Sequence, residues 1–334
     1  MRFRKIITAV DGHTEGEPVR LITGGIPHIP GNTMAEKRDF FRQNLDYLRT
    51  ALCFEPRGHR TMFSCVMTPP VTGGAAFGVI FMGSTTYPDM CGHGSIGVAT
   101  MAVEMGIVEP KEPVTEILID TPGGSVHTRV NIEHGTARSA TLRNVPSFLY
   151  KTMQVNIPSL GQLPVDVAYG GNFFAIVQAK DIGIRPFADD IAAASNLLGQ
   201  IKESIEQQVE IKHPELDFIR GITGFVINDK ASNPKANIKN IACPSHGKYV
   251  DRSPCGTGTC AKMAALYAKG ELGLGETYVT ESIIGSLFWG KLIEEVTVGS
   301  FRAVLPEVTG RAFITGIHNF VIDEDDPFKY GFQV

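Results

Sequence analysis

Residues 91–107 read CGHGSIGVATMAVEMGI, and residues 255–271 read CGTGTCAKMAALYAKGE. Both stretches open with Cys-Gly-x-Gly and a hydroxyl residue, continue through small residues, and reach a glycine fifteen positions after the cysteine, at Gly106 and Gly270. A glycine just past a run of helix-forming residues is typical of a helix C-terminus. Each stretch therefore predicts a helix that begins directly after its cysteine. Because the two copies lie about half of the 334-residue chain apart, we infer that each half carries the same unit.

Short apolar runs bounded by turn residues predict β-strands on both sides of these helices. The expected strands are Lys5–Val10, Val19–Thr23, Met62–Met67, Gly78–Met82, Val165–Ala168, Phe173–Gln178, Gly221–Ile227, Asn237–Ala242, Phe301–Val304 and Arg311–Ile322. Thr33 and Glu36 have capping-box spacing, and the apolar residues Phe41, Leu45, Leu48 and Leu52 then follow at helical intervals. A second long helix is expected over 188–209. The fold class is therefore mixed α/β.

The length and the internal duplication predict two domains. We expect residues 1–155 to form an N-terminal lobe with Cys91, and residues 156–311 a C-terminal lobe with Cys255. The segment 312–334 is expected to return to the first lobe. The segment Pro146–Leu163, which has Lys151 as its single charged residue, is the expected connection between the lobes.

Composition excludes several classes of protein. The net charge is −4 and no run of Lys and Arg occurs, which argues against a nucleic-acid partner. Residues 64–88 carry no charge, but their prolines and glycines exclude a lipid-spanning helix, and the N-terminus has no apolar run long enough for a signal peptide. No pair of the six cysteines has C-x-x-C spacing. We therefore expect free thiols in a reducing compartment, the cytoplasm.

A cysteine directly before a helix has a chemical use. The N–H groups of the first helical turn and the helix dipole stabilise a thiolate, and can lower a cysteine pKa from about 8.5 to roughly 3.5–7.5. Glycines beside it let those N–H groups approach an anion such as a carboxylate. Two such units facing each other would remove a proton from one side of a carbon and deliver one to the other. A single copy would more often be a plain helix start, but two matched copies favour catalysis. The cysteines at 53, 65, 243 and 260 are expected to be ordinary buried thiols.

Longer motifs around both cysteines resemble those of the proline racemase family. They are MCGHG at 90–94, DRSPCGTGT at 251–259, DGHTEGEP at 11–18, GGIP at 24–27, EPRGH at 55–59, GGNFFAI at 170–176 and DDPFKYGF at 325–332. The resemblance runs nearly end to end. It implies the diaminopimelate epimerase-like fold, in which two pseudo-symmetric lobes each wrap a sheet around a central helix and the active site lies in the cleft between them.

The resemblance also implies roles for individual residues. Cys91 and Cys255 would be the acid and base of a cofactor-independent racemase, and Asp251 would accept hydrogen bonds from the ring ammonium of the substrate. His93 would contact the substrate or orient Asp251. The substrate carboxylate would lie on backbone N–H groups at the two helix starts, which comprise Gly92, His93, Gly94, Gly256 and Thr257. No cofactor and no metal are expected, and the family suggests a homodimer.

The substrate itself is less sharply indicated. Phe63 matches an aromatic wall that suits the unsubstituted ring of proline, because an unpaired buried hydroxyl costs about 1–3 kcal/mol. Ser245 and His246 could instead bind the hydroxyl of 4-hydroxyproline. We expect a proline racemase, with 4-hydroxyproline 2-epimerase as the alternative.

Two further activities are less favoured. In the family's trans-3-hydroxyproline dehydratases the second cysteine is typically threonine, whereas position 255 here is cysteine. The remaining hypothesis is a non-enzymatic binding or redox protein with a Cys91–Cys255 disulfide.

Overall fold

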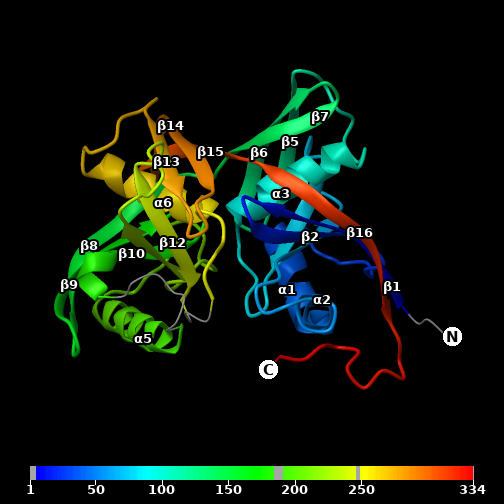
Figure 1. Cartoon of the computed structure of the whole chain (residues 1–334), viewed down its shortest axis with the longest axis horizontal. Coiled ribbons are helices and arrows are strands. Elements are labelled where there is room, and N and C mark those ends of the chain that lie inside the picture. The colour runs from blue at the N-terminus through cyan, green and yellow to red at the C-terminus, as the bar shows by residue number, and fades with distance from the viewer. Residues whose placement is uncertain (1–4, 184–190, 246–248, 334) are drawn as a thin grey trace. The chain divides into compact units, whose positions relative to one another are not determined.

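The chain folds into two units. The computed structural model describes residues 5–183, 191–245 and 249–333, of which 191–193 are described in backbone only. Unit 1 contains Met1–Leu142 and Gly310–Val334, and unit 2 contains Arg143–Thr309 (Figure 1). The segment Pro146–Leu163, expected to connect the lobes, lies wholly in unit 2, so the chain changes units earlier than residue 155. It forms strand β8 (Ser147–Ile157) and the start of β9, and alternate residues in the second half of β8 are buried.

Unit 1 is a mixed sheet with helices on both faces. Its strands follow the order β7-β6-β5-β4-β3-β2-β1-β16. Their bounds are β1 Lys5–Thr14, β2 Glu17–Gly24, β3 Ser64–Thr68, β4 Phe77–Met82, β5 Val114–Thr121, β6 Gly124–Glu133, β7 Thr136–Arg143 and β16 Ala312–Ile322. Helix α3 (Gly92–Glu104) contacts β1, β2, β6 and β16 and is buried along nearly its whole length (Figure 1).

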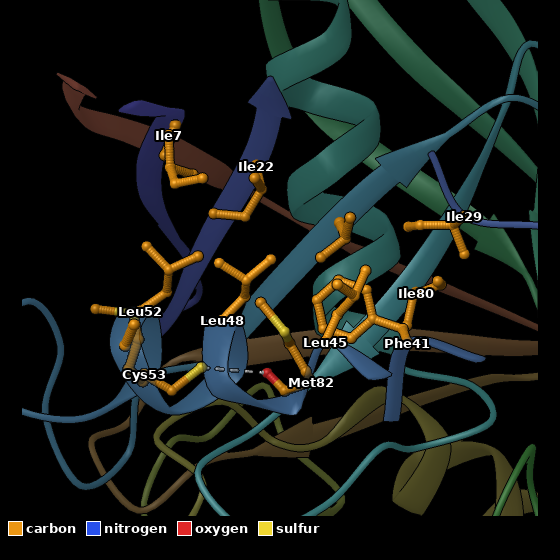
Figure 2. Close-up of a cluster of buried hydrophobic side chains, with 14 of the residues drawn as sticks. Ile7, Ile22, Ile29, Phe41, Leu45, Leu48, Leu52, Cys53, Ile80 and Met82 are labelled. Atoms are coloured by element: carbon orange, nitrogen blue, oxygen red, sulfur yellow. Dashed lines mark hydrogen bonds between the residues drawn. The ribbon is translucent and has the colours of Figure 1, made fainter. Parts of the chain in front are cut away.

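Helices α1 (Met34–Asn44) and α2 (Asp46–Cys53) pack on the other face of this sheet. Figure 2 shows Phe41, Leu48 and Leu52 of the two helices among apolar side chains of β1, β2 and β4. Since side chains of a strand alternate between faces, Ile80 and Met82 of β4 enter this cluster while Phe81 between them points toward α3. The sheet therefore separates two apolar layers.

The single helix expected after Thr33 is two helices. The capping interaction is confirmed, because the Glu36 N–H donates to Thr33 Oγ1 at 3.1 Å. The helix ends at Leu45, whose backbone (φ −127°, ψ 14°) is not helical, and α2 begins at Asp46. Leu45 is nevertheless buried, so the apolar stripe continues across the break and conceals it in the sequence. Asp46 favours a new helix start because its carboxylate lies in the first turn, where it also accepts from Tyr87 Oη at 2.6 Å.

Unit 2 repeats the same plan around helix α6 (Gly256–Ala268). The strands β8 to β15 follow the order β14-β13-β12-β11-β10-β9-β8-β15, and β15 also pairs with β14, which closes the ring. The other strands are β9 Gly161–Tyr169, β10 Phe173–Gln178, β11 Gly224–Asp229, β12 Ile238–Pro244, β13 Thr277–Glu281, β14 Leu287–Val298 and β15 Phe301–Gly310. The short α4 (Ala179–Ile182) and the long α5 (Ile191–Gln208) complete the unit, and the part of the expected 188–209 helix before Ile191 lies outside the described residues.

Strand directions show that the duplication inferred from the two cysteine stretches extends to the fold. From β1 to β6 the successive pairings are antiparallel, parallel, antiparallel, parallel and antiparallel. The series from β9 to β14 is identical. Helix α3 joins β4 to β5, and α6 joins β12 to β13, which are the corresponding places. The mixed α/β class is thus confirmed. In the described part of the chain, no helix is both long and apolar enough to span a membrane.

Candidate active site

Cys91 is the N-cap of α3. Its backbone is extended, with φ of −143°, and its Sγ accepts a hydrogen bond from the Gly94 N–H at 3.3 Å. The helix ends before Gly106, whose φ of 68° is left-handed, as the sequence predicts. The side chain of Cys91 is 7% exposed. A buried sulfur is therefore held against the positive end of a helix.

Cys255 occupies the same place on α6. Its Sγ accepts from the Gly258 N–H, also at 3.3 Å. Its φ of 63° is in the left-handed region, which is uncommon for a residue with a Cβ and costs about 1–3 kcal/mol. The Ser253 Oγ accepts from the Cys255 N–H at 3.1 Å and helps to hold this conformation. Sequence reasoning missed Ser253, whose only signal was its position two residues before the cysteine.

Gly94 and Gly258 are glycines because the sulfur lies so close to the first turn. A Cβ on Gly94 would lie 3.2 Å from Cys91 Sγ and 3.1 Å from ring atoms of both Phe63 and Phe81. A Cβ on Gly258 would lie 3.1 Å from Cys255 Sγ and 2.8 Å from Val226. The residue three positions after each cysteine thus has to lack a side chain for its N–H group to reach the sulfur.

His93 and Phe63 lie beside Cys91. The Nδ1 atom of His93 is 3.2 Å from Cys91 Sγ. The ring of Phe63 packs edge-on against the His93 ring, with centroids 4.6 Å apart, and Phe63 is itself buried. The structure therefore brings together the predicted residues of unit 1, which are Phe63, Cys91, Gly92, His93 and Gly94. Phe81 completes this apolar wall and was not foreseen, although its alternation with Ile80 and Met82 in a buried strand was a usable signal.

In unit 2, Asp251 and Thr257 lie beside Cys255. Thr257 Oγ1 is 3.7 Å from Cys255 Sγ, and Asp251 Oδ1 accepts from the Ser253 N–H at 2.8 Å. Asp251 also donates its N–H to Ala242 O in β12 at 2.8 Å, which fixes the approach to the helix. Ser245 is half-buried in the turn after β12, where its N–H donates to Thr223 O. His246 lies outside the described residues.

The expectation of a lowered thiol pKa is wrong for Cys255. Burial raises the pKa of the Cys255 thiol well above its ordinary value, and the nearby negative charge of Asp251 raises it further. Hydrogen bonds from the Gly258 N–H and the Thr257 hydroxyl lower the pKa of Cys255, but by less than burial raises it. Desolvation disfavours the charged form of any thiol, and here it exceeds the contribution of the helix N-terminus. Cys255 is therefore a protonated thiol at neutral pH.

All six cysteines are free thiols, and the four outside the two helix starts are buried. Burial raises the pKa of Cys53 and Cys65 above the ordinary value of 9.0, and that of Cys243 and Cys260 to about 12. Among the described residues, no three His, Cys, Asp or Glu side chains gather as metal ligands would.

The buried thiols make stability depend on pH in the alkaline range. Below pH 9 the thiols are protonated in both the folded and the unfolded chain. As pH rises above 9.0 the unfolded chain loses these protons first, so the free energy of unfolding falls. The Cys243 thiol is expected to contribute a loss of about 1 kcal/mol between pH 9 and pH 10. Urea unfolding of the wild type and Cys243→Ala at both pH values, with reductant present, measures this. The variant should lose about 1 kcal/mol less than the wild type, and equal losses would contradict the assignment.

Comparisons with known proteins extend over both units. A family model described as "Proline racemase" matches residues 9–333. A proline racemase of Clostridioides difficile is 46% identical over 333 residues, covering 99% of both chains. A 4-hydroxyproline 2-epimerase of Streptosporangium roseum is 45% identical over 338 residues, also covering 99% of both. A solved hydroxyproline epimerase from Agrobacterium vitis, with bound trans-4-hydroxy-L-proline, has a TM-score of 0.89 and 32% identity, and the match covers 100% of this chain and 96% of that one.

Proposed function

Because this chain belongs to the proline racemase family of isomerases, we propose that it interconverts L-proline and D-proline by acid–base chemistry at Cys91 and Cys255. The observation that carries the proposal is the equivalence of the two cysteines. Each caps the central helix of its unit, and each sulfur accepts from the N–H three residues later at the same distance of 3.3 Å. A racemase needs two such groups, because the proton leaves one face of Cα and arrives on the other.

The chemistry follows from the groups at each helix start. One cysteine acts as a thiolate and takes the α-proton, and its S–H bond forms as the Cα–H bond breaks. The other cysteine acts as a thiol and delivers its proton to the opposite face, which leaves it as the thiolate. The reverse reaction uses the same groups with their roles exchanged, so no proton is gained or lost overall.

Loss of an α-proton places negative charge on the substrate, and this charge has to be stabilised. The N–H groups of Gly92 and His93 in α3, and of Gly256 and Thr257 in α6, lie in first helical turns, where the helix supplies no carbonyl partner four residues back. We propose that these groups bind the substrate carboxylate and receive the charge that develops on it. Asp251 would bind the ring ammonium, and that cation would offset the negative charge that raises the pKa of Cys255.

Proline is favoured over 4-hydroxyproline by the surroundings of Cys91. Phe63 is buried, packs on His93, and lies with Phe81 against the helix start, so this side of the site is aromatic. A ring hydroxyl placed there would lose its hydrogen bonds with water. Ser245 supports the alternative, a 4-hydroxyproline 2-epimerase, because its half-buried hydroxyl lies in the turn that precedes Asp251. A homodimer stays a prediction from the family, and a cytoplasmic location stays a prediction from the free cysteines.

Proton exchange in heavy water distinguishes these substrates. With L-proline and trans-4-hydroxy-L-proline supplied together and the thiols kept reduced, we expect the α-proton NMR signal of proline to disappear while that of hydroxyproline persists. Selective loss of the hydroxyproline signal would instead identify a 4-hydroxyproline 2-epimerase. It would also indicate that the turn with Ser245 selects the substrate. Persistence of both signals would exclude both substrates.

A further inference from the structure

The two half-sites differ at the position two residues after each cysteine. In α3 this residue is His93, whose Nδ1 is 3.2 Å from Cys91 Sγ. In α6 it is Thr257, whose hydroxyl is 3.7 Å from Cys255 Sγ. An imidazole can accept the proton of a thiol and stay beside the thiolate as a cation. A hydroxyl can donate a hydrogen bond but takes no proton at neutral pH. The matched helices therefore hold chemically different partners for their sulfurs.

We propose that His93 makes the two cysteines unequal by holding Cys91 as the thiolate in the free enzyme, so that Cys255 carries the proton to be delivered. This inference deepens the proposed function and rests on it. In the step itself, the S–H bond of Cys91 breaks and an N–H bond forms at Nδ1 of His93, which gives a thiolate and an imidazolium with no proton lost to solvent. His93 is thus a positioning residue: it acts on the substrate through Cys91, by holding the proton that Cys91 gives up.

The His93 ring is held in place for this contact. Its residue is 7% exposed, and the edge-on packing of Phe63 fixes the plane of the ring. Thr14 Oγ1 donates to His93 O at 2.8 Å and anchors the first turn to β1. Little freedom is left for the ring to turn away from the sulfur. Burial penalises both charges of such a pair, but the low dielectric also strengthens the attraction between the thiolate and the imidazolium, which offsets that cost.

The remaining groups around this pair come from several elements. Thr14 of β1, Phe63 before β3 and Phe81 of β4 are uncharged. Asp89, two residues before Cys91 in the chain, forms an ion pair with Arg38 of α1. Arg38 offsets the negative charge of Asp89, and the imidazole of His93 is in direct contact with the sulfur.

The groups around Cys255 favour the opposite state. Asp251 presents a negative charge, and the Cys260 thiol lies on the same helix. Both act with burial to raise the pKa of Cys255. The two units therefore start from complementary states, with a base in unit 1 and an acid in unit 2. Such a free enzyme is ready for one enantiomer of the substrate and has to exchange its proton before it accepts the other.

Alkylation by iodoacetamide, resolved by peptide mass spectrometry, tests the assignment on the intact protein. The rate at each cysteine is measured from pH 5 to pH 9.5, and the Cys91 rate is normalised to its alkaline plateau to remove differences in access. In the wild type we expect Cys91 to reach its plateau near neutral pH while the Cys255 rate still rises at pH 9.5. In His93→Thr, which copies Thr257, the normalised Cys91 rate at pH 7 should fall about tenfold or more.

Two controls separate this effect from a change in structure. The variant Thr257→Ser keeps the hydroxyl and should move neither profile, and His93→Thr should leave the Cys255 profile in place. A structural disturbance alone would change the plateau rate without moving the midpoint. The inference is overturned if the two cysteines titrate together in the wild type, or if His93→Thr leaves the Cys91 midpoint unchanged. Wild-type proton exchange from proline is measured in parallel. Exchange without a shifted midpoint defeats only this inference, and a shifted midpoint without exchange from either substrate defeats only the proposed function.

Discussion

Cys91→Ser and Cys255→Ser are each expected to lose racemisation of proline by about 10²–10⁴-fold, the usual contribution of a general acid or base. Serine keeps the size and polarity of the side chain, but its hydroxyl is far too weak an acid to supply or regenerate the required anion. Because each face of Cα depends on one sulfur, loss of either sulfur should stop inversion. Optical rotation of L-proline and D-proline solutions measures the rate.

Heavy water makes this test sharper. A variant with one remaining thiol can still remove a proton from one face and return a deuteron to the same face. Cys91→Ser should therefore label one enantiomer of proline without inverting it, and Cys255→Ser should label the other. Cys53→Ala and Cys243→Ala, which alter buried thiols away from the helix starts, serve as controls and should racemise at nearly the wild-type rate. If one serine variant still inverted both enantiomers, the two-cysteine mechanism would be excluded.

The fold could be predicted as far as local patterns determine it. The repeated Cys-Gly-x-Gly stretches predicted both central helices and the duplication, because glycines at a helix start and end leave a clear pattern. The strands β5 to β8, β13 and β14 were not foreseen. In β5, β6 and β8, charged residues such as Glu116, Arg129 and Lys151 lie among the buried positions and obscure the apolar period. The break at Leu45 was hidden because a buried leucine serves both helices.

The site could be predicted in its residues but not in its proton states. The motifs identified Cys91, Cys255, His93 and Asp251, which the structure places at the two helix starts. The sequence suggested that a helix start can lower the pKa of either thiol, because a linear pattern reveals a cysteine's place before a helix but not its burial. Two effects depend on packing and leave no trace in the sequence. Desolvation raises the pKa of Cys255, and the fold places His93 against the sulfur of Cys91.

Gly94→Ala is expected to reduce kcat/KM for proline by about 10²-fold, although it adds a single methyl group. The new Cβ would lie 3.2 Å from Cys91 Sγ and 3.1 Å from the Phe63 and Phe81 rings, and all three side chains are buried around the start of α3. Since neither ring can retreat within a close-packed sheet face, the sulfur has to move away from the helix. A displacement of even part of an ångström removes the bond from the Gly94 N–H and misaligns the thiolate with the α-proton.

Gly199→Ala provides the matched control. Gly199 lies inside α5, and its new Cβ would meet nothing within 4 Å, so the same change should increase stability by up to about 1 kcal/mol through helix propensity. Activity should be unchanged there. Thermal unfolding of both variants, beside initial rates of racemisation, separates a local effect on the sulfur from general loss of fold. Gly94→Ala should lose far more activity than its change in melting temperature explains. Full activity in Gly94→Ala would show that the close approach of sulfur and N–H is not needed, and that the thiolate obtains its stability elsewhere.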